Sequence, residues 1–365
     1  MKKIICFMLI VCALPFPMRC FALGVSAQSA IVIDAVYGNV LYEKNAHTKM
    51  TMASTTKIMT ALCAVEEGDL DKKIKVDDSA VGVEGSSIYL KYGEELTLRE
   101  LVYGLMLNSG NDAAVAIACA VSGSVEKFAQ LMNYKAHEIG VKNTQFKNPN
   151  GLDEEGHYTT AYDLAKITAY ALKNEEFRKI SATQRYTISG PEGDRYLKNH
   201  NKLLSRMEGC IGVKTGFTKK SGRCLVSACQ RDKKEVVCVT LNAPDDWNDH
   251  MAMTDFALSQ ITVKPVAKKD ESLGMVSVKN GEKKSVEAVV KNDFFVSAAD
   301  GRKYVAIYKK PENVCAPVKA GQKIGYLEFY MEDELKKTLP VIAKESIAKK
   351  KSFLDNLMIV AKSFF

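Results

Sequence analysis

Short apolar runs of the kind typical of β-strands lie at both ends of the region from residue 28 to residue 262. Residues 30–35 and 39–43 are rich in apolar and β-branched side chains and are split by a glycine-containing turn, which predicts an antiparallel hairpin. Residues 222–228 and 235–241 form a second such pair. Amphipathic helical patterns fill the sequence between the two pairs. We therefore expect an α/β (α+β) domain whose antiparallel sheet is built from both ends, with a helical insert packed on it.

A different pattern follows this domain. A charged, proline-containing stretch at residues 264–271 predicts a linker. Beyond it, short alternating runs are separated by Gly, Asn and Pro, which predicts a small all-β domain over residues 263–340. Its expected strands are residues 275–278, 286–290, 304–308 and 323–328.

The segment 341–365 carries a basic cluster, Lys349-Lys350-Lys351, followed by apolar residues spaced by three and four. That spacing predicts a basic amphipathic helix that lies in the plane of a membrane surface, because only about fourteen residues are available and a span needs about twenty. The alternative is a terminal helix docked on its own domain.

The first residues predict a secretory signal peptide over residues 1–27. Two lysines precede an apolar run from Ile4 to Phe16, and small residues follow. The preferred cut is after Ala27, with a cut after Ala22 as the second choice and an uncleaved anchor as the alternative. An exported protein at the outer face of the cytoplasmic membrane or in the cell wall is expected.

Composition excludes several classes of protein. The formal net charge of +8 suits an anionic wall or membrane surface, but the basic residues are dispersed among acids, so nucleic-acid binding is not expected. The ten cysteines are scattered, without a C-x-x-C pair. We expect neither a disulfide framework nor a metal site, and no cofactor.

The segment Ala53-Ser54-Thr55-Thr56-Lys57 has the spacing of a nucleophile and its base. A serine hydroxyl needs a base within hydrogen-bond reach, and residues three apart on a helix share a face. Burial and nearby positive charge lower the pKa of a lysine enough for it to accept a proton. Alone, the motif is equally a helix start in which Ser54 is the cap.

Two further motifs strengthen this interpretation. Ser109 and Asn111 precede an alanine-rich helix. Ser109 can relay a proton, and Asn111 can hold a substrate amide and the base, although such residues are also ordinary helix caps. Lys214, Thr215 and Gly216 precede the second strand pair, where they offer a cation, a hydroxyl and a close backbone approach to a carboxylate. S-x-x-K, S-x-N and K-T-G in this order are the signature of serine penicillin-binding proteins and related β-lactamases.

The sequence resembles the D-alanyl-D-alanine carboxypeptidases, the low-molecular-mass penicillin-binding proteins of serine peptidase family S11. The likeness covers about residues 26–257, and the carboxy-terminal β-domain and tail are similar to the family's architecture as well. It includes the segments 85–94, 148–152, 157–165 and 242–244.

The resemblance implies a penicillin-recognising transpeptidase-like fold and a site for peptidoglycan stem peptides. Ser54 would attack the carbonyl between the last two D-alanines with Lys57 as base, and water would then release the shortened peptide. β-Lactams would acylate the same serine. Ser109 and Asn111 would serve proton transfer and positioning.

The resemblance also implies that Lys214, Thr215 and Gly216 bind the substrate carboxylate and strand. The oxyanion would rest on the backbone N–H groups of Ser54 and Phe217, where stabilisation of developing charge is largest. Phe217 stands where the family often has histidine.

Three other functions share parts of this signature. A β-lactamase of one large class needs an added E-x-x-x-N glutamate, and residues 145–150 offer none. A β-lactam sensor or wall-binding protein without turnover would keep the pocket, and a D,D-endopeptidase would share the site. His157 is interpreted as loop support, because Ser54 already has Lys57.

Overall fold

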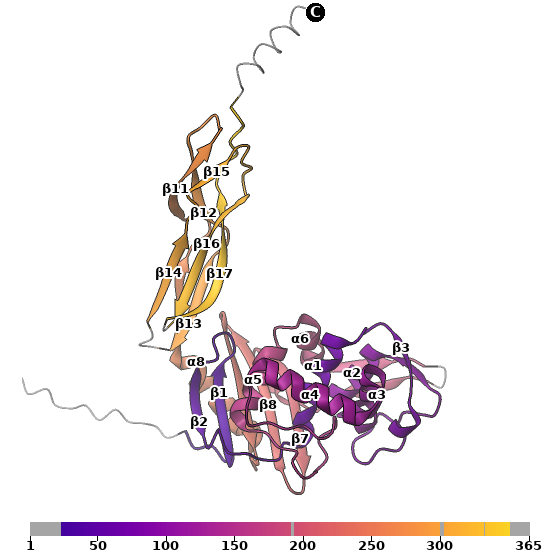
Figure 1. Ribbon diagram of the computed structural model, residues 1–365. Helices are drawn as coiled ribbons and strands as arrows, with labels where there is room; N and C mark the ends of the chain where they lie inside the picture. Colours follow the sequence, from indigo (N-terminus) through magenta and orange to yellow (C-terminus); the bar gives the residue numbers. More distant parts are fainter. Residues whose placement is uncertain (1–22, 191–192, 300–302, 332, 351–365) are drawn as a thin grey trace, which may run out of the picture.

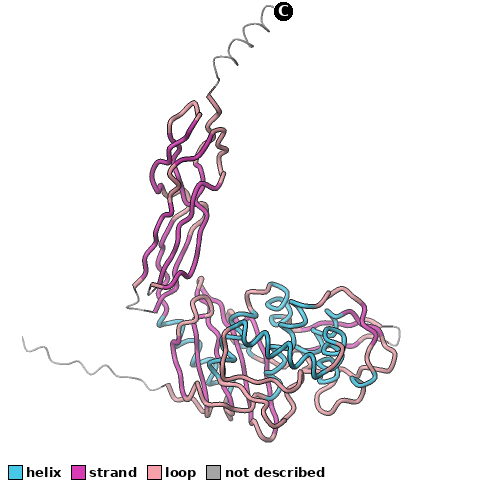
Figure 2. The backbone as a smooth tube through the Cα atoms, in the orientation of Figure 1, coloured by secondary structure: helices cyan, strands magenta, loops and turns pink. Residues whose placement is uncertain are grey.

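The computed structural model describes residues 23–190, 193–299, 303–331 and 333–350. The chain forms a mixed first domain and an elongated second domain that extends away from it (Figure 1). Helices gather in the first domain, whereas the second is built of strands and loops (Figure 2). Within the described residues no single helix is long and apolar enough to cross a membrane; two consecutive helices pass that test only together, as a pair bent by 82°.

The first domain contains a five-stranded antiparallel sheet in which both ends of the domain meet, as predicted. Strand β1 pairs with β2 on one side and with β9 on the other. The turn between β8 and β9 has positive φ at both Asp232 and Lys233, the geometry of a two-residue hairpin turn. The order across the sheet is β2 (Val40–Lys44), β1 (Ser29–Asp34), β9 (Lys234–Leu241), β8 (Gly222–Arg231) and β7 (Cys210–Thr218).

Helices cover both faces of this sheet. Because successive strand residues point to opposite faces, Ile31 and Ile33 pack into the core under the helical insert, while Ala30 and Val32 pack against the last helix of the domain, α8 (Asp246–Gln260). The insert consists mainly of α1 (Lys57–Glu67), α2 (Leu98–Leu107), α3 (Asn111–Ser122), α4 (Val125–Ile139), α5 (Ala161–Ala171) and α6 (Glu175–Ala182).

Short elements complete the insert. A 3₁₀ turn, η1, covers Ala53–Thr56 and leads directly into α1. The remaining elements are the turn η2 (Asp78–Ala80), the hairpins β3 (Lys73–Lys75) with β4 (Glu95–Thr97) and β5 (Arg185–Ile188) with β6 (Arg195–Lys198), and the single-turn helix α7 (Leu203–Arg206).

Two helix starts of the insert carry the first two sequence motifs. The first eight residues of α3 are buried, and their small side chains allow close packing against α1, α2 and α4. The first eight residues of α1 are buried as well, Lys57 included. The motifs therefore stand on rigid, internal helices.

The second domain follows without a linker. The predicted linker at 264–271 is wrong in its first half, because α8 leads directly into strand β10 (Ile261–Ala267), which pairs with β13 (Phe294–Ala299). The predicted all-β character is confirmed. The six-stranded sheet has the order β14 (Tyr304–Lys309), β16 (Lys323–Met331), β17 (Glu334–Ala343), β12 (Ser285–Val290), β11 (Ser272–Lys279) and β15 (Asn313–Cys315).

The β-domain was predicted to end at residue 340, but it extends further along the chain. Strand β17 continues to Ala343, and isolated bridges join Ile347 to Val318 and Lys349 to Gly281. Residues 341–350 therefore belong to the β-domain rather than to a helix. The rest of the predicted amphipathic helix, 351–365, and the predicted signal segment up to residue 22 lie outside the described residues.

The two domains meet through a small aromatic cluster. The rings of Tyr37 and Phe329 lie 6.1 Å apart, and the Asn39 amide contacts the sulfur of Met331 at 3.7 Å. Tyr37 belongs to the turn between β1 and β2, so the β-domain rests on the edge hairpin of the first sheet.

His250 of α8 is buried against the sheet between two hydroxyls. Its Nδ1 lies 2.6 Å from Ser227 Oγ and its Nε2 3.0 Å from Thr240 Oγ1. Burial lowers the pKa of the ring from 6.5 to about 3. The folded chain therefore holds His250 neutral, whereas the unfolded chain binds a proton as the pH falls through 6.5.

We predict that this histidine makes the first domain less stable in acid. The contribution of His250 to the free energy of unfolding is complete above pH 6.5 and is lost as the pH falls towards 3. In that range the free energy of unfolding falls with a slope that approaches about 1.4 kcal/mol per pH unit. Urea unfolding followed by the fluorescence of Trp247, the single tryptophan, measures it. In His250→Gln, which keeps both hydrogen bonds possible, the slope between pH 4 and 6 should shrink by that amount; an unchanged slope would contradict the assignment.

Candidate active site

Ser54 and Lys57 lie side by side at the start of α1. Ser54 belongs to η1, and the Lys57 Nζ is 2.9 Å from its Oγ. The same Nζ donates to Asn111 Oδ1 at 2.7 Å and to the Asn150 carbonyl at 2.5 Å. The predicted Ser54–Lys57 contact is therefore present.

Lys57 is fully buried, and burial lowers its pKa far below the ordinary value. The charge of nearby Lys214 lowers this pKa further, while Asp112 acts in the opposite direction. A neutral amine has two N–H donors and one lone pair. With the two donors directed to Asn111 and Asn150, the lone pair is left for the Ser54 hydroxyl, which is the arrangement of a base.

Asn111 is fixed by its own contacts. Its backbone N–H donates to the Ser86 carbonyl at 2.7 Å, and its Nδ2 donates to the Glu84 carbonyl at 2.5 Å. Because the amide nitrogen is held on that side, the Oδ1 faces Lys57. The contact of Asn111 with the base was predicted from the sequence, whereas the second contact of Lys57, with the carbonyl of Asn150, was not.

The loop that supplies the Asn150 carbonyl can approach Ser54 only because of a glycine. Gly151 has φ +88°, and a Cβ there would lie 2.0 Å from the Ala53 carbonyl oxygen. The Asn148 side chain accepts the Gly151 N–H at 2.7 Å. The segment 148–152 was noted in the sequence as a family likeness, but nothing in its residue types indicated that a backbone oxygen would orient the base.

The edge strand β7 runs past the serine. A Cβ on Gly216 would lie 3.0 Å from the backbone nitrogens of Ser54 and Thr55, so glycine permits this close approach. Within the described residues strand β7 pairs with β8 alone, and an extended peptide can add to the other edge of such a strand.

Lys214 is buried beneath this strand. Its Nζ donates to the Thr215 carbonyl at 2.9 Å, and burial lowers its pKa to about 7. A lysine with this pKa gains its full charge when an anion arrives, because the anion favours the protonated form.

A cleft of about 350 Å³ brings most of the predicted residues together. Ser54, Ser109, Thr215, Gly216 and Phe217 line it. Lys57, Asn111 and Lys214 are buried and do not line it. Phe217 exposes 66% of its surface at the rim, and Ser109 has a positive φ of 60°.

The cleft also contains a cation that the sequence analysis missed. Arg223, opposite Phe217 in the β7–β8 pair, donates to Asp246 Oδ1 at 2.6 Å and lies 5.7 Å from the centre of the Trp247 ring. All three residues line the cleft. The buried Nε of Arg223 has no hydrogen-bond partner among the described residues. The sequence signal was a lone arginine in a strand, which carries no indication of a site.

His157 supports η1, the turn that contains Ser54, through a hydrogen bond to Thr56. Its Nδ1 accepts the Lys147 N–H at 3.0 Å, so its Nε2 carries the proton towards Thr56 Oγ1, 2.8 Å away. Burial lowers the pKa of His157 to about 4, which keeps it neutral. The hydroxyl of Thr56 in turn donates to the Ala53 carbonyl. These contacts agree with the structural role expected of this residue.

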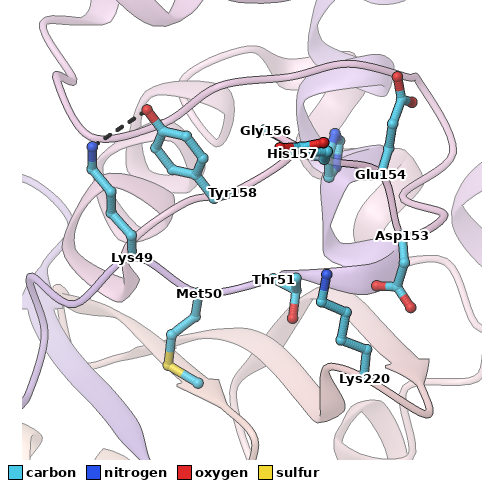
Figure 3. A pocket seen from close by; sticks show the side chains of 10 residues that line it. Lys49, Met50, Thr51, Asp153, Glu154, Gly156, His157, Tyr158 and Lys220 are labelled. Atoms are coloured by element: carbon cyan, nitrogen blue, oxygen red, sulfur yellow. Dashed lines mark hydrogen bonds between the residues drawn. The ribbon is translucent and has the colours of Figure 1, made fainter.

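A second hollow of about 530 Å³ also borders His157 (Figure 3). It is lined by His157 and by charged residues of both signs, among them Lys49, whose Nζ is 3.4 Å from the Tyr158 hydroxyl. Ser54 does not line it, so it is not the site of the chemistry.

A serine paired with a buried lysine of lowered pKa, beside an edge strand, defines a class: serine enzymes that act through an acyl-enzyme. Comparison with known proteins narrows this class to one family. The D-alanyl-D-alanine carboxypeptidase family model matches residues 18–245, and the model of the carboxy-terminal domain of penicillin-binding protein 5 matches residues 262–349. The chain belongs to the D-alanyl-D-alanine carboxypeptidase family, as its sequence resemblance predicted.

Known carboxypeptidases are similar to this chain in sequence. The chain is 36% identical to the D-alanyl-D-alanine carboxypeptidase DacF of Bacillus subtilis, with 91% of this chain and 88% of that protein covered. It is 38% identical to a D-alanyl-D-alanine carboxypeptidase of a Streptomyces species, with 60% and 81% covered.

A solved structure, penicillin-binding protein 5 from Haemophilus influenzae, matches at 25% identity and a TM-score of 0.63, with 89% of this chain and 98% of that chain covered. The predicted fold class is confirmed, including the added β-domain.

Proposed function

We propose that this protein is a serine-type D-Ala-D-Ala carboxypeptidase that removes the terminal D-alanine from peptidoglycan pentapeptide stems through an acyl-enzyme on Ser54. The observation that carries the proposal is the set of contacts of Lys57, which direct its lone pair to the Ser54 hydroxyl. Membership of the family supports the substrate class and the binding of β-lactams.

In the first step, Lys57 takes the hydroxyl proton while Ser54 Oγ attacks the carbonyl between the two D-alanines. The negative oxygen that forms is stabilised by the backbone N–H groups of Ser54 and Phe217. Ser109, which lines the same cleft, passes the proton to the departing amine. D-Alanine leaves as a neutral amine, and the shortened stem remains as an ester of Ser54.

In the second step, water attacks this ester. Lys57 takes a proton from the water, the ester carbonyl again becomes an oxyanion, and Ser54 leaves as its hydroxyl with that proton. The products are the shortened stem and the free enzyme. The same sequence of transfers traps a β-lactam, because its opened ring stays attached and no leaving group departs.

The carboxylate of the terminal D-alanine is bound at the strand side of the cleft. Lys214 supplies a charge from beneath β7, and Thr215 supplies a hydroxyl from its edge. Arg223 supplies a second charge, oriented by Asp246, a nearly buried carboxylate. Two cations on one carboxylate favour a free carboxy terminus over an amide.

Mutation of the nucleophile tests the reaction. Ser54→Ala should lower D-alanine release from a pentapeptide by at least about a thousand-fold, because no acyl-enzyme can form. Mass spectrometry of the released amino acid measures it. Ser205→Ala, an exposed serine of α7, should retain full activity. Turnover that persists in Ser54→Ala, or a wild-type protein that is acylated but releases no D-alanine, would contradict the proposal.

Mutation of Arg223 tests the carboxylate contact. A charge-assisted hydrogen bond contributes about 1.5–3 kcal/mol, so Arg223→Gln should raise the KM for the pentapeptide by about ten- to a hundred-fold, with a smaller effect on kcat. Steady-state kinetics with the pentapeptide and its carboxy-terminal amide measure it. The amide should react slowly and equally with both enzymes; an equal KM for the free acid in both would exclude this role.

We also propose that the protein is exported and that the signal peptide is cut after Ala22. Packing of the next residues supports this cut over the one after Ala27 that the sequence favoured. Ser26 donates from its N and Oγ to the Asp249 carboxylate at 2.9 and 2.7 Å, and Ala27 is fully buried. Lys44 donates to the Val25 carbonyl at 2.8 Å. A cut after Ala27 would remove all these contacts.

The mass of the exported protein tests this. A mature protein that begins at Leu23 is expected, and intact-mass spectrometry of the wall or membrane fraction of producing cells measures it. A mature protein that begins at Gln28, or one that retains Met1, would contradict the cut.

We propose that residues 351–365 hold the enzyme at the membrane surface. The basic cluster at 349–351 and the apolar spacing beyond it support this. Removal of 351–365 should move the protein from the membrane pellet to the supernatant without changing pentapeptide turnover. Pelleting with anionic vesicles measures binding; equal pelleting of both forms would exclude the tail as the anchor.

A further inference from the structure

We propose that a basic hollow beside the catalytic cleft is a second binding site, which takes a doubly charged phosphate group, and that its occupancy weakens the binding of the peptide substrate. The hollow has a volume of about 370 Å³. It shares Lys202 with the cleft that contains Ser54. The binding site is argued from its lining residues alone, whereas its effect on the substrate rests on the proposed function.

The charge of the hollow has one sign. Its wall contains four cations, Arg185, Lys198, Lys202 and Arg206, and none of the described residues that line it is acidic. Within the part of the chain that the structure describes, none of the four has an ion-pair partner. The hollow that borders His157 differs, because it contains three acidic residues beside its two lysines.

The fold places these cations against one another in two pairs. Arg185 and Lys198 are directly opposite partners in the antiparallel β5–β6 hairpin. Lys202 and Arg206 are four residues apart, at the N-cap and at the last residue of the single-turn helix α7. Like charges in either arrangement repel each other and destabilise the fold. An anion in the hollow would relieve both repulsions, which indicates a binding site rather than a structural cluster.

Asn201, in the same wall, has a hydrogen-bond donor without a partner. Asn201 is 2% exposed, and its Oδ1 accepts the Leu203 N–H at 3.1 Å. The buried Nδ2 has no partner among the described residues. Buried polar groups are nearly always hydrogen-bonded. The wall therefore has an excess of donors as well as of positive charge, and an oxyanion, which only accepts hydrogen bonds, complements both.

The backbone that carries these side chains is fixed by hydrogen bonds. The Nδ2 of Asn199 donates to the Thr183 carbonyl at 2.9 Å, and its Oδ1 accepts the Asn201 N–H at 2.9 Å. The Nε2 of Gln184 donates to the Leu204 carbonyl at 3.1 Å. The wall is thus organised before a ligand arrives, which lowers the entropic cost of binding.

A phosphate group fits this wall better than a carboxylate does. A phosphate monoester carries a charge of about −1.5 to −2 at neutral pH and has three acceptor oxygens, whereas a carboxylate carries a single charge. Arginine meets phosphate oxygens with paired N–H groups, and lysine supplies a point charge. Four cations without an acid exceed what one carboxylate balances.

The hollow is connected to the cleft through the segment from Lys198 to Lys202. The N–H of Lys198 donates to Asn108 Oδ1 at 3.0 Å, and the N–H of His200 donates to the Leu107 carbonyl at 3.2 Å. Both His200 and Lys202 line the cleft. A dianion bound beside Lys202 places negative charge next to the cleft, which disfavours the carboxylate of the peptide.

Calorimetry with inorganic phosphate on the full chain tests the site. The test variant Lys198→Gln/Arg206→Gln removes one cation from each pair, and neither residue lines the cleft. The control Lys127→Gln/Lys142→Gln removes two exposed lysines that have no ion-pair partner among the described residues. Wild type and control should bind phosphate, and the test variant should bind it at least about tenfold more weakly.

Absence of binding by wild type, or equal affinity in all three proteins, would overturn the site. Without phosphate the test variant should melt no lower than wild type, because repulsion has been removed; a lower melting temperature would show that the cations are structural and would also overturn it. Glycerol phosphate and short-chain phosphatidic acid, compared in the same way, distinguish a free phosphate from a lipid headgroup as the source.

Steady-state kinetics test the coupling to the cleft. Saturating phosphate should raise the KM of wild type for the pentapeptide by about fivefold or more, with kcat unchanged, relative to chloride at equal ionic strength. The test variant should lose this effect; a rise that persists there would place the phosphate in the cleft and overturn the coupling. Calorimetry needs no turnover, so a protein that binds phosphate but releases no D-alanine would contradict the proposed function and still support the site.

Discussion

The site depends on one constraint: a buried lysine whose pKa is held well below its ordinary value. An unpaired ammonium is expensive in the interior. Within the part of the chain that the structure describes, the hydrogen-bond partners of Lys57 are a hydroxyl, an amide oxygen and a backbone carbonyl, none of them a carboxylate. The positive charge of Lys214 adds to the penalty. Loss of the proton removes this cost, and in the proposed mechanism it creates the lone pair that activates Ser54.

Close packing around η1 maintains that constraint. Strand β7 and the loop 148–152 approach the serine turn from two sides, and in each case a glycine, Gly216 or Gly151, makes the approach possible. His157 holds the turn from behind through Thr56. The catalytic groups come from a 3₁₀ turn, two helix starts, a loop and an edge strand, and it is the buried sheet and insert that hold them in register.

Much of this could be predicted from the sequence, because the motifs carry their own geometry. A spacing of three places Ser54 beside Lys57 on any helix, and the alternating runs at both ends of the domain identify the sheet. The Asn150 carbonyl and the cleft position of Arg223 could not be predicted, since a backbone oxygen has no sequence signal and the partner of Arg223, Asp246, is 23 residues away. The linker prediction failed because Pro265 sits in a strand, β10, that pairs with β13 alone within its sheet. There a proline is tolerated.

The most direct test of this account is the rate at which a penicillin acylates Ser54 as a function of pH, measured by mass spectrometry on wild type and Lys57→Gln. Acylation isolates the base step from hydrolysis of the ester. The account predicts a rate that rises with pH through an ionisation far below that of an ordinary lysine, and a variant that is slower by at least about a hundred-fold and lacks this rise. If Lys57→Gln is acylated as fast as wild type, or keeps the same rise, then Lys57 is not the base.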